Sequence, residues 1–236
     1  MMDLIIALAH WFGSAVCHQW PSHSYFVAGV ELPLCARCTG MYLGALITLL
    51  YLAWRHPRAV GVPPAWALIA MLLFFLAWGG DGVNSFLATI PTPIPSLYPP
   101  ENILRLTTGA LMGVSLGALT FIMVNSQLWR QVSPAPVLAS LREFLGLLGL
   151  IALLIFAVAS EAEWLLFPLT LACLISILVL HTTLMSAMAA NLLRWFANNW
   201  REASRPLLAG LVVGLAYLDG IALLRVLLGI YLGYPI

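Results

Sequence analysis

Charge is scarce in this sequence, and lysine is missing from it altogether. Charged residues make up 8% of the 236 positions, and all ten basic residues are arginine. Without lysine, the chain cannot form a Schiff base or use an amine nucleophile. The net charge is +1 and the arginines are scattered instead of forming a basic stripe. We therefore expect no nucleic-acid partner.

Long polar stretches are also absent, because 62% of the residues are hydrophobic. Soluble domains carry about a quarter charged residues, so this composition indicates an integral membrane protein. The chain has room for about six helices of roughly 20 residues. Apolar runs predict spans at 39–54, 63–79, 103–124, 144–160, 164–188 and 207–232. The expected fold class is all-α, a polytopic transmembrane helical bundle in the cell's inner or plasma membrane, with membrane lipid as its partner.

The apolar stretch at residues 4–16 lacks the basic residues that precede a secretory signal, so we expect it to stay on the mature protein. It is too short to cross a bilayer alone. This length favours a short N-terminal interfacial or re-entrant helix, with a tilted seventh span as the alternative. The chain then divides into an N-terminal cysteine/histidine segment at the outer face, 1–38, and a transmembrane helical domain, 39–236.

Arginine recurs in alternate connections between the spans. The connections after the first, third and fifth spans carry Arg55, Arg58, Arg130, Arg142, Arg194, Arg201 and Arg205. Cytoplasmic loops of membrane proteins are enriched in arginine, so these connections are expected inside and both termini outside. The outer connection at 80–101 contains five prolines and is expected to be stiff and extended.

Only four cysteines occur, yet three of them gather beside the first span, at Cys17, Cys35 and Cys38. The last two have the two-residue spacing that lets both sulfurs reach one ion or form a short disulfide. Cys17 and His18 could complete a tetrahedral site with them. For a sulfur-rich set of this kind zinc is the default ion, and copper(I) or an iron–sulfur cluster is less favoured.

Two alternatives to this ligand set stay open. Adjacent residues seldom both bind one metal without strain, so His23 or His10 could replace His18 as the fourth ligand. Alternatively, Cys35 and Cys38 form a disulfide on an oxidising outer face, with Cys17 free. A separate functional alternative is a thiol-disulfide redox or assembly factor whose cysteines exchange disulfides.

Polar residues from two other parts of the chain fall at the same membrane boundary as the cysteines. Arg37 lies between two cysteines and would favour their thiolate forms. Asp81 follows the second span, and Asn102 and Arg105 lie at the start of the third. We expect Asp81 to pair with Arg105, because an intramembrane charge needs compensation.

These residues suggest a membrane-embedded enzyme acting on a lipid or prenyl-type substrate. In this hypothesis the metal and Arg37 organise the site and Asp81 acts as acid or base. Asn102 and Arg105 would orient a polar or anionic head.

A transporter or metal-handling protein is the alternative suggested by two charges inside the last span, Asp219 and Arg225. Six residues apart on a helix, they project about 240° from each other. They must therefore find partners elsewhere.

Two motifs carry a family resemblance: Cys-His-Gln at 17–19 and Pro-Leu-Cys-Ala-Arg-Cys-Thr-Gly at 33–40. The chain resembles a prokaryotic family of predicted multi-pass membrane proteins of unknown function. The likeness continues through Asp81-Gly82, Asn102, Arg105 and Gly109. It covers roughly residues 17–115 and implies a shared site without naming its chemistry. The family usually has arginine at the position of His23 and glutamine at that of Asn84.

Overall fold

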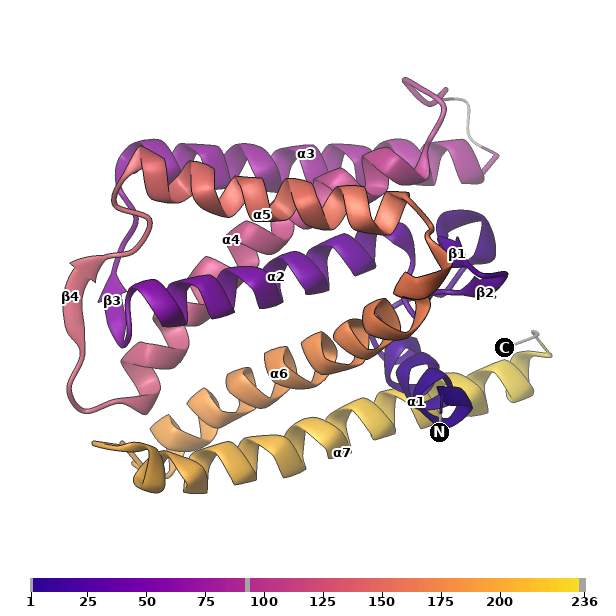
Figure 1. Ribbon diagram of the computed structural model, residues 1–236. Coiled ribbons are helices and arrows are strands. Elements are labelled where there is room, and N and C mark those ends of the chain that lie inside the picture. The colour runs from indigo at the N-terminus through magenta and orange to yellow at the C-terminus, as the bar shows by residue number, and fades with distance from the viewer. Residues whose placement is uncertain (1, 92–93, 234–236) are drawn as a thin grey trace.

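Long apolar helices run side by side in the computed structural model, which describes residues 2–91 and 94–233 (Figure 1). Six helices in this part of the chain are long and apolar enough to cross a membrane. They are α2 (Ala36–Arg55), α3 (Ala65–Thr89), α4 (Asn102–Leu128), α5 (Leu141–Ala159), α6 (Leu166–Leu192) and α7 (Trp200–Leu232). The all-α bundle of about six spans is confirmed.

The boundary that differs most from the prediction is the end of the second span. The sequence predicts that the second span ends at residue 79, but α3 continues to Thr89. Asp81 and Asn84 are buried within it, each 2% exposed, and both bind partners inside the protein. Because these polar side chains are satisfied within the fold, they do not end the helix.

The N-terminal helix α1 (Met2–Ser14) packs against α6 and α7. Figure 1 shows α1 nearly end-on, whereas the six long helices run across the view. It therefore lies across one end of the bundle and does not run beside the spans. This placement agrees with the expected interfacial helix.

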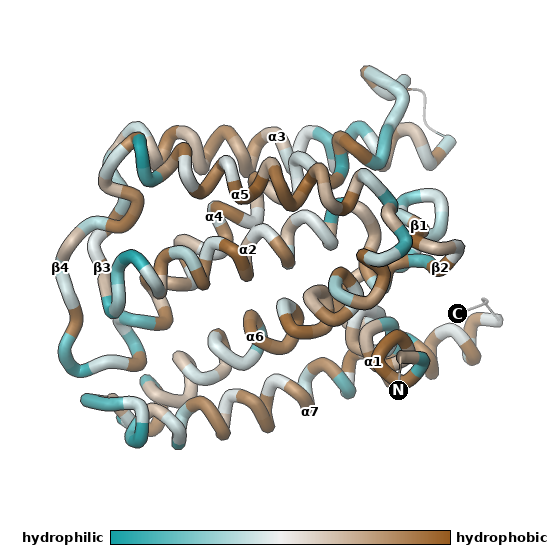
Figure 2. Tube along the Cα trace, viewed as in Figure 1, coloured by the Kyte–Doolittle hydropathy of each residue, from teal (hydrophilic) through white to brown (hydrophobic). Residues whose placement is uncertain are grey.

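The arginine-bearing connections meet at one end of the bundle. There β3 (Ala59–Gly61) pairs in parallel with β4 (Ser133–Pro136), and Trp129 forms a parallel bridge with Ala197. The antiparallel pair β1 (Phe26–Val27) and β2 (Val30–Glu31) lies at the opposite end, as do the 3-10 turns Pro21–His23 and Glu163–Leu165. In Figure 2 hydrophilic residues gather at the two ends, with hydrophobic residues between them. Which end faces the cytoplasm stays a prediction.

The closest helix packing joins α2 and α4. A Cβ atom added to Gly109 would lie 2.1 Å from the Arg37 carbonyl oxygen. Similar backbone contacts recur along the two helices at Gly40, Gly44, Gly113 and Gly117. Small residues at this spacing let helix backbones approach in a membrane, as expected for the glycines of the third span. The contact fixes the first turn of α2 against α4.

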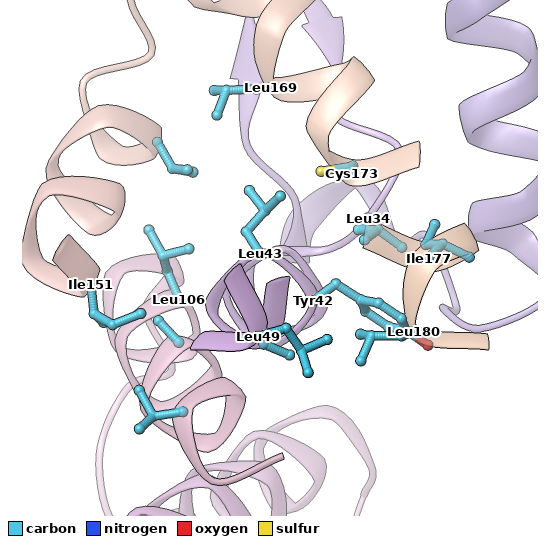
Figure 3. Close-up of a cluster of buried hydrophobic side chains, with 14 of the residues drawn as sticks. Leu34, Tyr42, Leu43, Leu49, Leu106, Ile151, Leu169, Cys173, Ile177 and Leu180 are labelled. Carbon is cyan, nitrogen blue, oxygen red and sulfur yellow. The ribbon is translucent and has the colours of Figure 1, made fainter. Parts of the chain in front are cut away.

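Buried apolar side chains fill the space between α2, α4, α5 and α6 (Figure 3). Leu43, Leu106, Ile151 and Ile177 each come from a different one of these helices. Cys173 belongs to the same cluster and is fully buried. The fourth cysteine is therefore a packing residue.

Candidate metal centre

The sulfur atoms of Cys17, Cys35 and Cys38 all lie within 4.8 Å of one another. Cys17 follows α1, Cys35 immediately precedes α2, and Cys38 lies in the first turn of α2. Sulfurs about 3.8 Å apart would surround one zinc ion tetrahedrally, since zinc–sulfur bonds are about 2.3 Å long. All three cysteines are free, so Cys35 and Cys38 are not joined by a disulfide in this structure. The three sulfurs are grouped as ligands of one cation would be.

The local backbone favours the thiolate form of Cys17. The amide N–H groups of Gln19 and Cys35 donate to the Cys17 sulfur, at 3.4 and 3.2 Å. Side-chain hydrogen bonds from Cys35 and Cys38 lower the pKa of Cys17 below its ordinary value. The N-terminal end of α2, the positive end of its dipole, lies beside this sulfur group. The site is electrostatically suited to a cation.

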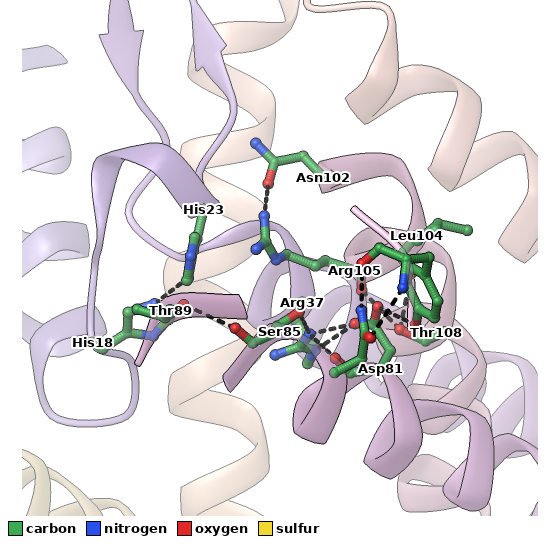
Figure 4. A network of polar contacts seen from close by, with 12 residues as sticks. His18, His23, Arg37, Asp81, Ser85, Thr89, Asn102, Leu104, Arg105 and Thr108 are labelled. Carbon is green, nitrogen blue, oxygen red and sulfur yellow. Dashed lines mark hydrogen bonds and ion pairs between the residues drawn. The ribbon is translucent and has the colours of Figure 1, made fainter. Parts of the chain in front are cut away.

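His18 borders the three sulfurs but lies outside their compact group. Hydrogen bonds with the thiols of Cys17 and Cys35 raise the pKa of His18 to about 9. Its Nε2 atom is hydrogen-bonded to Nδ1 of His23 at 3.1 Å (Figure 4). The imidazole is thus shared between the sulfurs and a second histidine.

The two alternative histidines are placed differently. His10 lies on α1, and its Nε2 is hydrogen-bonded to the Glu31 carbonyl oxygen at 3.1 Å. His23 contacts His18. Burial and the nearby charge of Arg105 lower the pKa of His23 to about 4, so it is neutral at pH 7. His10 is thus bound to a backbone carbonyl and His23 to His18, and the identity of a fourth ligand stays a prediction.

Partly buried Arg37 and buried Asp81 form an ion pair beside the cysteines (Figure 4). Nε of Arg37 donates to the Asp81 carboxylate at 3.1 Å, and its NH2 group donates to Asp81 and to Ser85 Oγ at 3.0 Å. The Tyr98 hydroxyl donates to the other carboxylate oxygen at 3.1 Å. The expected direct pair of Asp81 with Arg105 is therefore wrong. Because α3 continues as a helix past residue 79, Asp81 faces the first turn of α2.

Arg105 forms a second polar group with Asn102. It donates to Asn102 Oδ1 at 2.8 Å, and the Asn102 amide donates to the Ser24 carbonyl oxygen at 3.0 Å. Arg105 is only 5% exposed, and its Nε has no hydrogen-bond partner among the described residues. Buried donors are normally satisfied, so this N–H marks unused binding capacity.

Two side-chain amides hold the surroundings of the site. Sequence reasoning placed Asn84 at this membrane boundary but assigned no role to Gln19. The Gln19 side chain donates to the carbonyl oxygens of His10 and Pro33, both at 2.9 Å. Asn84 accepts from the Leu97 N–H at 2.7 Å and donates to the Tyr98 carbonyl at 3.0 Å. The available signal for Gln19 was its place in the Cys-His-Gln motif.

The charges of the last span are used to hold the N-terminal segment. Asp219 accepts a hydrogen bond from Trp11 Nε1 at 2.8 Å. Arg225 donates to the carbonyl oxygens of Ser14 and Cys17, and to that of His18 at 2.7 Å. As expected, each charge finds its partners outside α7. Arg225 caps the C-terminal end of α1, where a cation is favoured.

A cavity of about 330 Å³ borders the histidines and the ion pair. It is lined by His18, Trp20, His23, Arg37, Gly82, Ser85, Phe86 and Thr89. Polar groups line part of it, whereas Trp20 and the 60% exposed Phe86 give it an apolar side. The cavity can therefore receive a molecule with a polar head and an apolar body.

Comparisons with known proteins concern the part of the chain that contains this site. The family model described as "Predicted membrane protein (DUF2085)" matches residues 17–119. An uncharacterized protein of Methanothermobacter thermautotrophicus is 32% identical over 108 residues, or 46% of this chain and 86% of the relative. An uncharacterized protein of Methanocaldococcus jannaschii is 31% identical over 104 residues, or 44% of this chain and 60% of the relative. No solved structure matches. The extent and identity of these matches show that the chain belongs to the DUF2085 family of predicted membrane proteins.

Proposed function

We propose that the protein is a membrane-embedded zinc enzyme acting on a lipid or prenyl-type substrate. The observation that carries this proposal is the convergence of three cysteine sulfurs within 4.8 Å at the start of α2. Cys17, Cys35 and Cys38 would bind the ion, with His18 as the fourth ligand. Three thiolates and an imidazole form a common zinc ligand set.

The adjoining cavity supports a role beyond structure. His18 both borders the sulfurs and lines the 330 Å³ cavity, so a molecule in the cavity would lie beside the metal. Zinc with a displaceable fourth ligand supplies Lewis-acid chemistry or an activated water. Phe86 is 60% exposed on a helix that is largely unburied, which suits entry of a lipid from the bilayer.

The polar residues would bind the head of this substrate. Arg37 lines the cavity, and Arg105 holds an unused buried N–H nearby. Asp81 was expected to act as acid or base, but its oxygens accept hydrogen bonds from Arg37 and Tyr98. Both carboxylate oxygens are thus already used as hydrogen-bond acceptors within the protein. We therefore assign Asp81 to positioning Arg37, and Arg37, Arg105 and Asn102 to orienting an anionic head.

Metal analysis tests this function. Protein purified anaerobically should contain about one zinc per chain, and Cys35→Ser or Cys38→Ser should remove most of it, because each deletes one of three thiolates. Cys173→Ser is the matched control, since Cys173 lies in the apolar core, and it should retain the ion. A metal-free protein with a Cys35–Cys38 disulfide would contradict the proposal and favour the redox alternative.

We also propose an orientation in the membrane. The end of the bundle that carries Cys17, Cys35 and Cys38 (the cysteine end) faces outward, and the end with the arginine-bearing connections (the arginine end) faces the cytoplasm. Exposed Glu163 and Gln131 lie at the two ends and provide sites for Glu163→Cys and Gln131→Cys. A membrane-impermeant thiol reagent should label Glu163→Cys in intact cells and Gln131→Cys only after permeabilisation, with the parent protein as control. The opposite labelling pattern would place the metal centre on the cytoplasmic side.

A further inference from the structure

The arginine end contains a second polar cavity, of about 250 Å³, far from the cysteines. Its lining comes from the connections after α4 and α6 and from the start of α7. The lining residues are Arg130, Arg194, Trp195, Phe196, Glu202 and Arg205. Three guanidiniums and one carboxylate thus surround a small space.

The single carboxylate of the cavity, that of Glu202, already accepts hydrogen bonds from the residues just before α7. Glu202 accepts hydrogen bonds from the N–H and the side-chain amide of Asn198, and from the side-chain amide of Asn199, at 2.8–2.9 Å. Across the described ranges, the ion pairs are Arg37–Asp81 and His56–Glu143. None of the three cavity arginines forms such an ion pair, although Glu202 and Arg130 interact electrostatically across the cavity. The three guanidiniums therefore outnumber the one carboxylate.

Backbone hydrogen bonds hold the cavity in shape. Arg130 N–H donates to the Ala197 carbonyl at 2.9 Å, and Ala197 N–H donates to that of Leu128 at 2.8 Å. Nε of Arg130 donates to the Phe196 carbonyl at 3.3 Å. The wall contributed by the α6–α7 connection is thus tied to the end of α4. A preformed site loses less conformational entropy when a ligand binds.

The cavity lies at headgroup depth of the proposed membrane. It is at the end of the long apolar helices, where Trp195 and Trp200 are 41% and 70% exposed. Tryptophan is enriched at the boundary between hydrocarbon and water. A ligand at this depth can combine a charged head in the cavity with an apolar chain in the bilayer.

We propose that this cavity binds the phosphate of an anionic membrane phospholipid. Guanidinium forks match phosphate oxygens in pairs, and basic pockets between membrane helices suit anionic headgroups. The site is independent of the zinc centre, from which it is separated by the length of the bundle.

Lipid retention in nanodiscs tests the proposal. Protein in nanodiscs of phosphatidylcholine and phosphatidylglycerol should retain phosphatidylglycerol preferentially after mild detergent extraction, as detected by native mass spectrometry. Arg194→Gln and Arg205→Gln should each weaken retention roughly fivefold, because one interfacial arginine contributes that order of binding. Arg201→Gln is the matched control, since Arg201 lies on the same helix but outside the cavity lining, and it should have little effect.

Several outcomes would overturn the assignment. Equal retention of phosphatidylcholine and phosphatidylglycerol would exclude a specific site. If Arg201→Gln and Arg205→Gln weakened lipid retention equally, the effect would be due to net charge and not to the cavity. Inorganic phosphate that binds with the same arginine dependence, without any lipid preference, would identify a soluble anion instead. If a glutamine variant loses its helical circular dichroism, Arg194→Lys replaces it. Arg194→Lys should bind the lipid more weakly than wild type and Arg201→Gln do, but more tightly than Arg205→Gln does.

Discussion

Replacing Asp81 by asparagine is expected to lower the free energy of unfolding of the bundle by about 3–5 kcal/mol. The substitution removes the buried carboxylate of the ion pair and leaves the partly buried guanidinium of Arg37 without its charged partner. It also changes the acceptor of the Tyr98 hydroxyl. Reversible unfolding in mixed micelles, followed by circular dichroism, measures the loss.

A double-mutant cycle identifies the partner. Arg37→Gln combined with Asp81→Asn should cost clearly less than the sum of the single substitutions, because neither charge is then stranded. Arg105→Gln is the control, since Arg105 forms no direct ion pair with Asp81 in the described residues, and its coupling should be smaller. Additive effects of the Arg37 and Asp81 substitutions would exclude the pair as an energetic unit. If Asp81 only positions Arg37, the double variant should recover stability without recovering substrate binding.

Gly109→Ala is expected to destabilise the protein by about 3 kcal/mol, at the upper end of the usual cost of overpacking. The added methyl group would lie 2.1 Å from the Arg37 carbonyl, so the first turn of α2 must move away from α4. That turn carries Cys38 and follows Cys35, so we also expect weaker zinc retention. Thermal unfolding and metal analysis of the same preparation measure both effects.

Gly149→Ala provides the comparison for this substitution. Nothing lies within 4 Å of a Cβ atom added at Gly149 in α5. Alanine is favoured over glycine in a helix by about 1 kcal/mol, so this variant should be as stable as wild type or more stable. Equal stability of the two variants would show that the α2–α4 contact adjusts to a methyl group without loss.

The sequence predicts the spans well because apolar length alone determines which segments can cross a bilayer. Their ends are less predictable where a polar residue is buried. In the sequence, Asp81 and Asn84 indicate the start of a loop. In the structure, Asp81 binds Arg37, and Asn84 binds the backbone of Leu97 and Tyr98. Those partners depend on how the helices pack, and no local pattern reveals that.

The grouping of the three cysteines follows from their spacing and from their place beside one span. The partner of Asp81 could not be predicted in this way, because Arg37 and Arg105 lie at the same depth and only helix rotation distinguishes them. His18 as a ligand stays a prediction. The partners of Arg225 lie more than 200 positions away in the sequence, so its spacing from Asp219 showed only that they were elsewhere.

The hydrogen bonds that Arg225 donates to the carbonyl oxygens of Cys17 and His18 have a consequence for biosynthesis. A ribosome completes the segment containing Cys17 long before it reaches Arg225, 208 residues later. Until α7 has entered the membrane, the first cysteine lacks the clamp that fixes its loop beside α2. The loop that carries Cys17 is therefore held by a residue made 208 positions later, so its place beside α2 depends on the insertion of α7.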